Sequence, residues 1–219
     1  MHVAIRVVLV GSFLGLASIA AAQTVVINAT VEIASIYDPE GFLPGDLEVG
    51  STGILEVAYR IDAVSGGPIN ANQASYFFPA GQLGITYSVG GHVWACSNTL
   101  TGEVDVVNDE PRKLNDTFGM SLEDSGGQFP YQVPGGHGQL TAFFRDDVLP
   151  LDLLHGLLLP TNASDVKFSE VTLATGFITT AGGGAHYWSI SLSLHDPMFA
   201  GTVAVANKSW GGVKTLYAR

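Results

Sequence analysis

The chain has 219 residues, of which 47% are hydrophobic and 13% are charged, and its formal net charge at pH 7 is −11. This acidic balance argues against nucleic acid and anionic membrane surfaces as partners, because binding to phosphate groups needs clustered cations. The single cysteine, Cys96, cannot form an internal disulfide, so stability has to come from the core. We expect Cys96 itself to be buried and inert.

Residues 1–22 have the pattern of a secretory signal peptide. Arg6 is followed by an apolar run that closes in alanines at Ala22, as in signals that are cleaved after small residues. The run is short and interrupted by Gly and Ser, so an uncleaved membrane anchor is the less favoured alternative. The mature protein would then be secreted, extracellular or periplasmic, without a membrane span, and would carry 8 Lys and Arg against 20 Asp and Glu, a formal charge of −12.

Most of the mature chain alternates between apolar and polar residues, which is the period of β-strands. In residues 24–37 the expected inward face holds Val25, Ile27, Ala29, Val31, Ile33 and Tyr37. Strands are expected over residues 24–37, 53–62, 82–89, 92–96, 102–107, 116–124, 138–144, 166–174, 185–194 and 201–206. Clusters of Gly, Pro, Asn and Asp separate them, and only residues 151–160 favour a short helix.

About ten short strands with turns between them predict an all-β fold, an antiparallel β-sandwich or jelly roll. We expect one domain over residues 23–195. Residues 196–219 are expected to form an edge strand, GTVAVA, followed by a loose tail. An exposed sheet edge of this kind offers a route to self-association.

The order of motifs resembles a domain of exported bacterial proteins that carry a PEP-CTERM sorting tail. The resemblance rests on VVINATVEIASI, GDLEVGSTGILEVAYRID, ITYSVGGHVW and VDVVNDEPRKLNDTFGMSL, within residues 24–195. It implies a β-sandwich associated with polysaccharide-rich cell envelopes and carries over no catalytic residue. The chain departs from that family at its C-terminus, where the sorting motif, the membrane helix and the basic cluster do not occur.

The stretch NDEPRKLND, residues 108–116, is the most concentrated polar motif. Asp109, Glu110, Asn115 and Asp116 supply oxygens of the kind that calcium prefers. Arg112 and Lys113 lie in the same stretch, and the spacing of a known calcium loop is absent. The favoured interpretation is a solvated hairpin tip, with a calcium site as the alternative and catalysis as a third.

No pattern predicts catalysis. The histidines are scattered without a metal-binding spacing. His195 and Asp196 are a base and a carboxylate in sequence, yet neighbours in an extended chain point to opposite faces. Acidic pairs such as Asp38 and Asp46 could serve glycoside hydrolysis only at a particular distance between their carboxylates, and the sequence alone does not give that distance. We therefore expect a protein that is not an enzyme.

Aromatic residues suggest a binding role. Tyr131, Tyr187 and Trp210 lie in or beside expected loops, where a ring can present an apolar face to a sugar or a protein. Alternation places Tyr187 outward and its neighbour Trp188 inward. The sequence thus favours a non-catalytic surface or extracellular-matrix protein that binds polysaccharide, with a calcium-stabilised adhesion module and a carbohydrate-active enzyme as successive alternatives.

Overall fold

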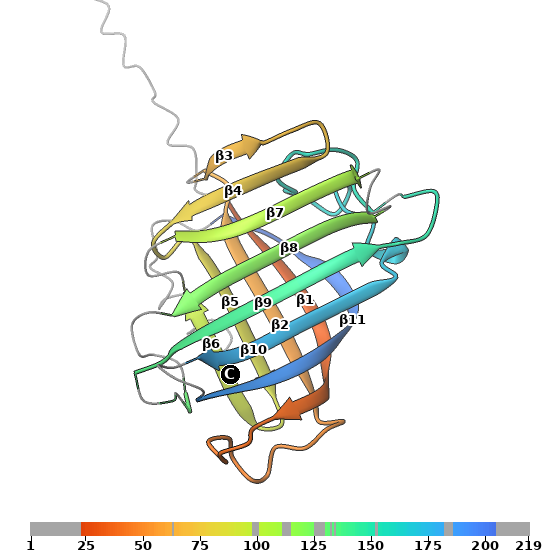
Figure 1. Ribbon diagram of the computed structural model, residues 1–219. Coiled ribbons are helices and arrows are strands. Elements are labelled where there is room, and N and C mark those ends of the chain that lie inside the picture. The colour runs from red at the N-terminus through yellow and green to blue at the C-terminus, as the bar shows by residue number, and fades with distance from the viewer. Residues whose placement is uncertain are drawn as a thin grey trace, which may run out of the picture.

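The fold is all-β, as the alternation predicts. The computed structural model (Figure 1) describes residues 23–204 apart from 63, 98–100, 111–114, 125–129, 132, 134, 152 and 182–185. The strands are β1 (Gln23–Tyr37), β2 (Thr52–Arg60), β3 (Ser65–Pro68), β4 (Gln73–Pro79), β5 (Leu83–Val89), β6 (His92–Ser97), β7 (Thr101–Glu110), β8 (Asn115–Asp124), β9 (His137–Asp146), β10 (Leu173–Ala181) and β11 (Tyr187–Ala204), with one 3-10 turn, η1 (Phe168–Glu170). The predicted signal peptide and Trp210 lie outside the described residues.

All eleven strands belong to one antiparallel sheet, in the order β3-β4-β7-β8-β9-β10-β11-β1-β2-β5-β6. The sheet curls so that its two halves pack face to face, and Figure 1 shows β7 to β10 crossing over β1, β2 and β5. We call β3, β4, β7, β8, β9, β10 and the first half of β11 the front half, and β2, β5, β6 and the first half of β1 the back half.

One tyrosine ties the two halves together through the core. Tyr87 lies on β5 in the back half, and its hydroxyl donates a hydrogen bond of 2.6 Å to the carbonyl oxygen of Thr141 on β9. A Cβ built on Gly176 would lie 2.2 Å from that hydroxyl oxygen, so only glycine leaves room for it. Burial raises the pKa of the Tyr87 phenol far above its ordinary value, which keeps the donor proton in place.

β1 and β11 run through both halves, because both are long and bend at breaks in their pairing. The register shifts at three places along the pair. At one of them Asp196 and Pro197 face the single residue Ala29, and Asp196 adopts a φ of 50°. Such bulges bend a strand and increase its twist. A second shift, between Ile33 and Ser35, reverses which residues face outward.

Several sequence-based boundaries are wrong. β11 continues across position 195/196, so the expected domain boundary falls inside one strand. After Ser193, β11 pairs with β1 on one side and with no other described strand. The two end strands of the whole sheet are β3 and β6. The expected strand over 166–174 is replaced by η1 and the start of β10, and the described residues of 151–160 form no helix.

Two further expectations concern the cysteine and membrane-spanning helices. Cys96 is buried, as expected, and forms no disulfide within the described residues. Among the described residues, no helix has the length and apolar character needed to cross a membrane.

Removing the Tyr87 hydroxyl is expected to weaken the link between the halves. In Tyr87→Phe the ring still packs in the core, but the hydrogen bond to Thr141 is lost. We expect the free energy of unfolding in urea to fall by about 1–2 kcal/mol. Tyr187→Phe, at an exposed position, is the matched control, and an equal effect of the two changes would contradict the role given to Tyr87.

Candidate functional site

The outer face of the front half is the most distinctive surface of the molecule. Alternation and register place side chains of β4, β7, β8, β9, β10, β11 and the end of β1 on this face, in rows that cross the strands. One row reads Ser75, Asp105, Gly119, Phe143, Thr175 and Ser193, and the next reads Phe77, Glu103, Ser121, Thr141, Phe177, Ser191 and Ser35. Hydroxyl groups and aromatic rings therefore lie side by side.

Exposed aromatic rings concentrate on this face. Among the described residues, Tyr37, Phe77, Tyr131, Phe177 and Tyr187 are the aromatic side chains with large exposed fractions. All of these except Tyr131 belong to the outer front face. Partly exposed rings that cluster on one face are a feature of interaction surfaces.

Tyr37 and Tyr187 form a stacked pair at one end of this face. Their ring centroids lie 5.0 Å apart with an interplanar angle of 24°, and a side-chain hydrogen bond to Tyr187 raises the pKa of the Tyr37 phenol. Beside them His186 Nδ1 lies 2.6 Å from a carboxylate oxygen of Glu40. Tyr187 points outward as predicted, whereas Tyr37 was expected to face inward and is turned outward by the register shift after Ile33.

A groove of about 390 Å³ crosses the same face near the other end of the strands. Its lining comes from β4, β7, β8, β9 and β10: Gln73, Asp105, Val107, Asn115, Thr117, Phe143, Arg145, Leu173 and Thr175. A Cβ on Gly119 would lie 2.6 Å from Cδ1 of Phe143. The Phe143 ring therefore leans across the neighbouring strand into the space above this glycine.

Two buried polar atoms in the groove lack a hydrogen-bond partner. The Asn115 side-chain oxygen, Oδ1, is one of them, and Asn115 is only 8% exposed. The Arg145 Nε is the other, although the same guanidinium donates through Nη2 to Asp147 at 2.6 Å. Buried polar atoms nearly always have a hydrogen-bond partner in folded proteins. These two atoms lack one, so the groove offers a donor and an acceptor to a ligand.

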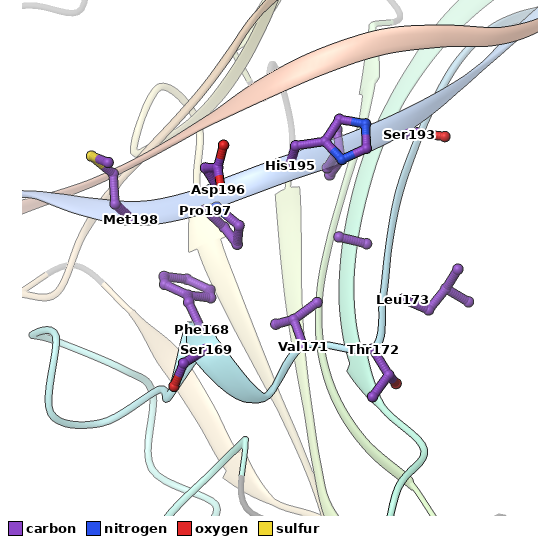
Figure 2. Close-up of a pocket in the computed structure, with 12 residues that line it drawn as sticks. Phe168, Ser169, Val171, Thr172, Leu173, Ser193, His195, Asp196, Pro197 and Met198 are labelled. Carbon is purple, nitrogen blue, oxygen red and sulfur yellow. The ribbon is translucent and has the colours of Figure 1, made fainter.

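A larger hollow of about 690 Å³ opens where β10 and β11 diverge (Figure 2). It is bordered by Phe168, Val171, Leu173 and the bulge around Pro197. Leu173 also borders the groove, so the two depressions are neighbours. His195 and Asp196 lie beside the hollow, and no hydrogen bond between their side chains occurs in the described part of the chain.

Two of the four predicted calcium residues, Asn115 and Asp116, point to opposite faces of the sheet. Asn115 lines the outer groove, whereas the next residue, Asp116, is fully buried on the core side, where it accepts a hydrogen bond from the Leu154 backbone at 3.1 Å. The side chains of Asp109 and Glu110 lie outside the described residues. No group of three His, Cys, Asp or Glu side chains that would hold a metal ion occurs within the described ranges.

Tyr131 lies away from the outer front face, at the end of the molecule near the β5–β6 turn. Its hydroxyl is 2.9 Å from Nδ1 of His92, whose Nε2 is 3.1 Å from Asp46. Its backbone oxygen accepts a hydrogen bond from the buried Trp188 indole. These contacts give Tyr131 a role in fixing the chain between β8 and β9, and they explain why it adopts a φ of 58°.

The sequence did not single out Phe143 or Phe177. Alternation predicts that one of Phe143 and Phe144 points outward, but only the pairing of β9 with β8 and β10 shows what surrounds that ring. Comparison of the chain with protein-family models, curated proteins and solved structures finds no match. The resemblance to PEP-CTERM proteins therefore stays a sequence-based expectation.

Glu103 gives this face a measurable pH dependence. Burial, and then the nearby Asp105, raise the pKa of Glu103. A carboxylate whose pKa is raised by folding contributes stability below its unfolded pKa and loses it as the pH rises through the folded value. We expect Glu103→Gln to raise the melting temperature at pH 7 and to have little effect below pH 4. A shift of equal size at both pH values would contradict this account, and Glu48→Gln, in the exposed β1–β2 connection, is the control.

Proposed function

We propose that the protein is an exported, non-catalytic surface or extracellular-matrix protein that binds polysaccharide on its outer front face. The observation that carries this proposal is the row of exposed aromatic rings among hydroxyl-bearing side chains. A sugar ring has apolar C–H faces and polar edges, so it suits a surface that alternates aromatic and hydroxyl groups. The signal-like N-terminus and the resemblance to envelope proteins support export.

The shape of the face favours a chain ligand. The groove crosses five adjacent strands, and neighbouring strands lie about 4.8 Å apart, so it extends over roughly 19 Å. Leu173 joins it to the hollow at the β10–β11 divergence. An elongated depression of this kind accommodates several linked sugar rings in a row.

The charges of the face favour an uncharged chain. Glu103 and Asp105 lie on it, and Arg145 is partly neutralised by Asp147. A protein with a formal charge of −12 after signal removal repels uronate-rich chains at low ionic strength. Neutral polysaccharides carry no such penalty.

Polysaccharide binding is tested by native electrophoresis in gels that contain neutral, uronate or amino-sugar polysaccharides. We expect neutral polysaccharide to retard the protein, and Phe177→Ala and Tyr187→Ala each to weaken binding at least about threefold, since a ring contact is worth about 0.5–1.5 kcal/mol. Ile54→Ala, at an exposed position on the outer back face, is the matched control. Retardation by none of the polysaccharides would refute the proposal.

A calcium-stabilised module is the second candidate, and one observation favours it. Asp116 and Asp146 lie directly opposite each other on β8 and β9, with exposed fractions of 0% and 2%. Like charges that face each other across strands are destabilising, and a divalent cation would relieve their repulsion. Backbone amides of Leu154 and Val148 donate to these carboxylates, so the pair also anchors the segment that follows β9.

Calcium binding is tested by thermal unfolding with millimolar calcium and then with EDTA. A ligand bound only by the folded state, at about 100 times its dissociation constant, adds about 2.7 kcal/mol, which is a rise of several degrees for a domain of this size. Asp146→Asn should abolish that rise if the pair binds the ion, whereas Asp62→Asn, at a surface ion pair, should leave it. An unchanged melting temperature on addition of calcium would remove this candidate.

A further inference from the structure

We propose that the groove beside Phe143 is the primary sugar subsite of the outer front face, and that it takes a neutral hexopyranose unit. In this arrangement the sugar ring stacks on Phe143, and one hydroxyl bridges Asn115 Oδ1 and Arg145 Nε. The inference rests on the proposed function and specifies its substrate class.

The two atoms without partners need opposite kinds of hydrogen-bonding group. Asn115 Oδ1 is an acceptor and needs a donor, whereas the N–H at Arg145 Nε is a donor and needs an acceptor. A hydroxyl does both, because it has one donor proton and two lone pairs. A sugar hydroxyl that lies between the two side chains would therefore pair with both atoms, once the Asn115 amide and the Arg145 guanidinium rotate to expose them.

A charged group in the place of that hydroxyl satisfies only one of the two atoms. The carboxylate of a uronate only accepts hydrogen bonds, so it leaves Asn115 Oδ1 unpaired, and it meets Asp105 in the same groove. The ammonium of an amino sugar only donates, so it leaves Arg145 Nε unpaired and is repelled by the guanidinium. An unsatisfied buried polar group is costly, so a unit that places a hydroxyl at this position is favoured over one that places its charged group there.

Phe143 distinguishes a sugar from a water molecule. Water also donates and accepts, but it gains nothing from an apolar ring, whereas the C–H face of a pyranose does. The ring of Phe143 lies above Gly119, where an alanine Cβ would come within 2.6 Å of it. Because the clashing atom belongs to a side chain on the surface, Gly119→Ala should displace the ring without unfolding the strand.

The experiment compares variants of the full chain in affinity electrophoresis and in urea unfolding. We expect Asn115→Ala, Arg145→Met and Gly119→Ala each to weaken binding of neutral polysaccharide about tenfold, as the loss of about 1.4 kcal/mol predicts. Asn115→Ala should leave the unfolding midpoint unchanged or raise it, because the oxygen it removes has no partner in the free protein. Thr179→Ala, on the same face outside the groove, is the matched control and should bind like the unmodified chain.

The outcomes separate the two levels of the proposal. If no polysaccharide retards the unmodified chain, the proposed function fails, and this inference fails with it. If neutral polysaccharide binds but the three groove variants bind it equally well, only the subsite is overturned. Tighter binding of polygalacturonate or chitosan than of every neutral chain would overturn the assignment of a neutral sugar and leave polysaccharide binding in place.

Discussion

The pairing of β1 with β11 is the constraint on which the rest of the molecule depends. Among the described strands, this pair alone joins the front half and the back half into one hydrogen-bonded sheet. A straight pair would hold the two halves in one plane, so the breaks in register are what allow the sheet to close over its core. The same breaks decide which residues face solvent. The shift after Ile33 turns Tyr37 outward beside Tyr187, so the geometry that closes the fold also builds one end of the aromatic face.

Tyrosines then fix what the strands enclose. Tyr87 spans the two halves, and the hydroxyls of Tyr59 and Tyr76 donate to backbone oxygens of Pro160 and Leu157 in the segment that covers one end of the core. Each phenol buries a large ring and satisfies its polar end, which is the economical way to place a polar group inside a protein. Hydrogen bonds from the core side of Tyr87 and Tyr76 thus anchor the front half to the rest of the molecule and give its outer face a firm support. Side chains on its outer face are therefore held in position before any ligand arrives, which reduces the entropy lost on binding.

Much of the fold follows from local pattern, and the site does not. Strict alternation identified the inward and outward faces where strands are regular, as at Trp188 and Tyr187, because period two needs no knowledge of neighbours. It failed at Tyr37, where a bulge moves the residue to the other face, and over 166–174, where the true strand begins at Leu173. Asn115 and Asp116, two of the predicted calcium ligands, lie on opposite faces of β8, because adjacent strand residues point apart. The groove joins residues of five strands that are up to about 100 positions apart in sequence, and only the pairing order brings them together.

The unpartnered atoms of the groove show why the rigidity matters. On a mobile surface Asn115 and Arg145 would rotate toward water and lose their unsatisfied state. Asn115 is instead only 8% exposed at the start of β8, and Arg145 is tethered by its bond to Asp147. In the free protein the two unpaired polar atoms lower the stability, and the well-packed core offsets this loss. A ligand hydroxyl that pairs with both atoms removes the loss, and the free energy gained contributes to binding. Affinity for an uncharged sugar, which has no ionic attraction to offer an acidic protein, would come from this retained cost together with the apolar face of Phe143.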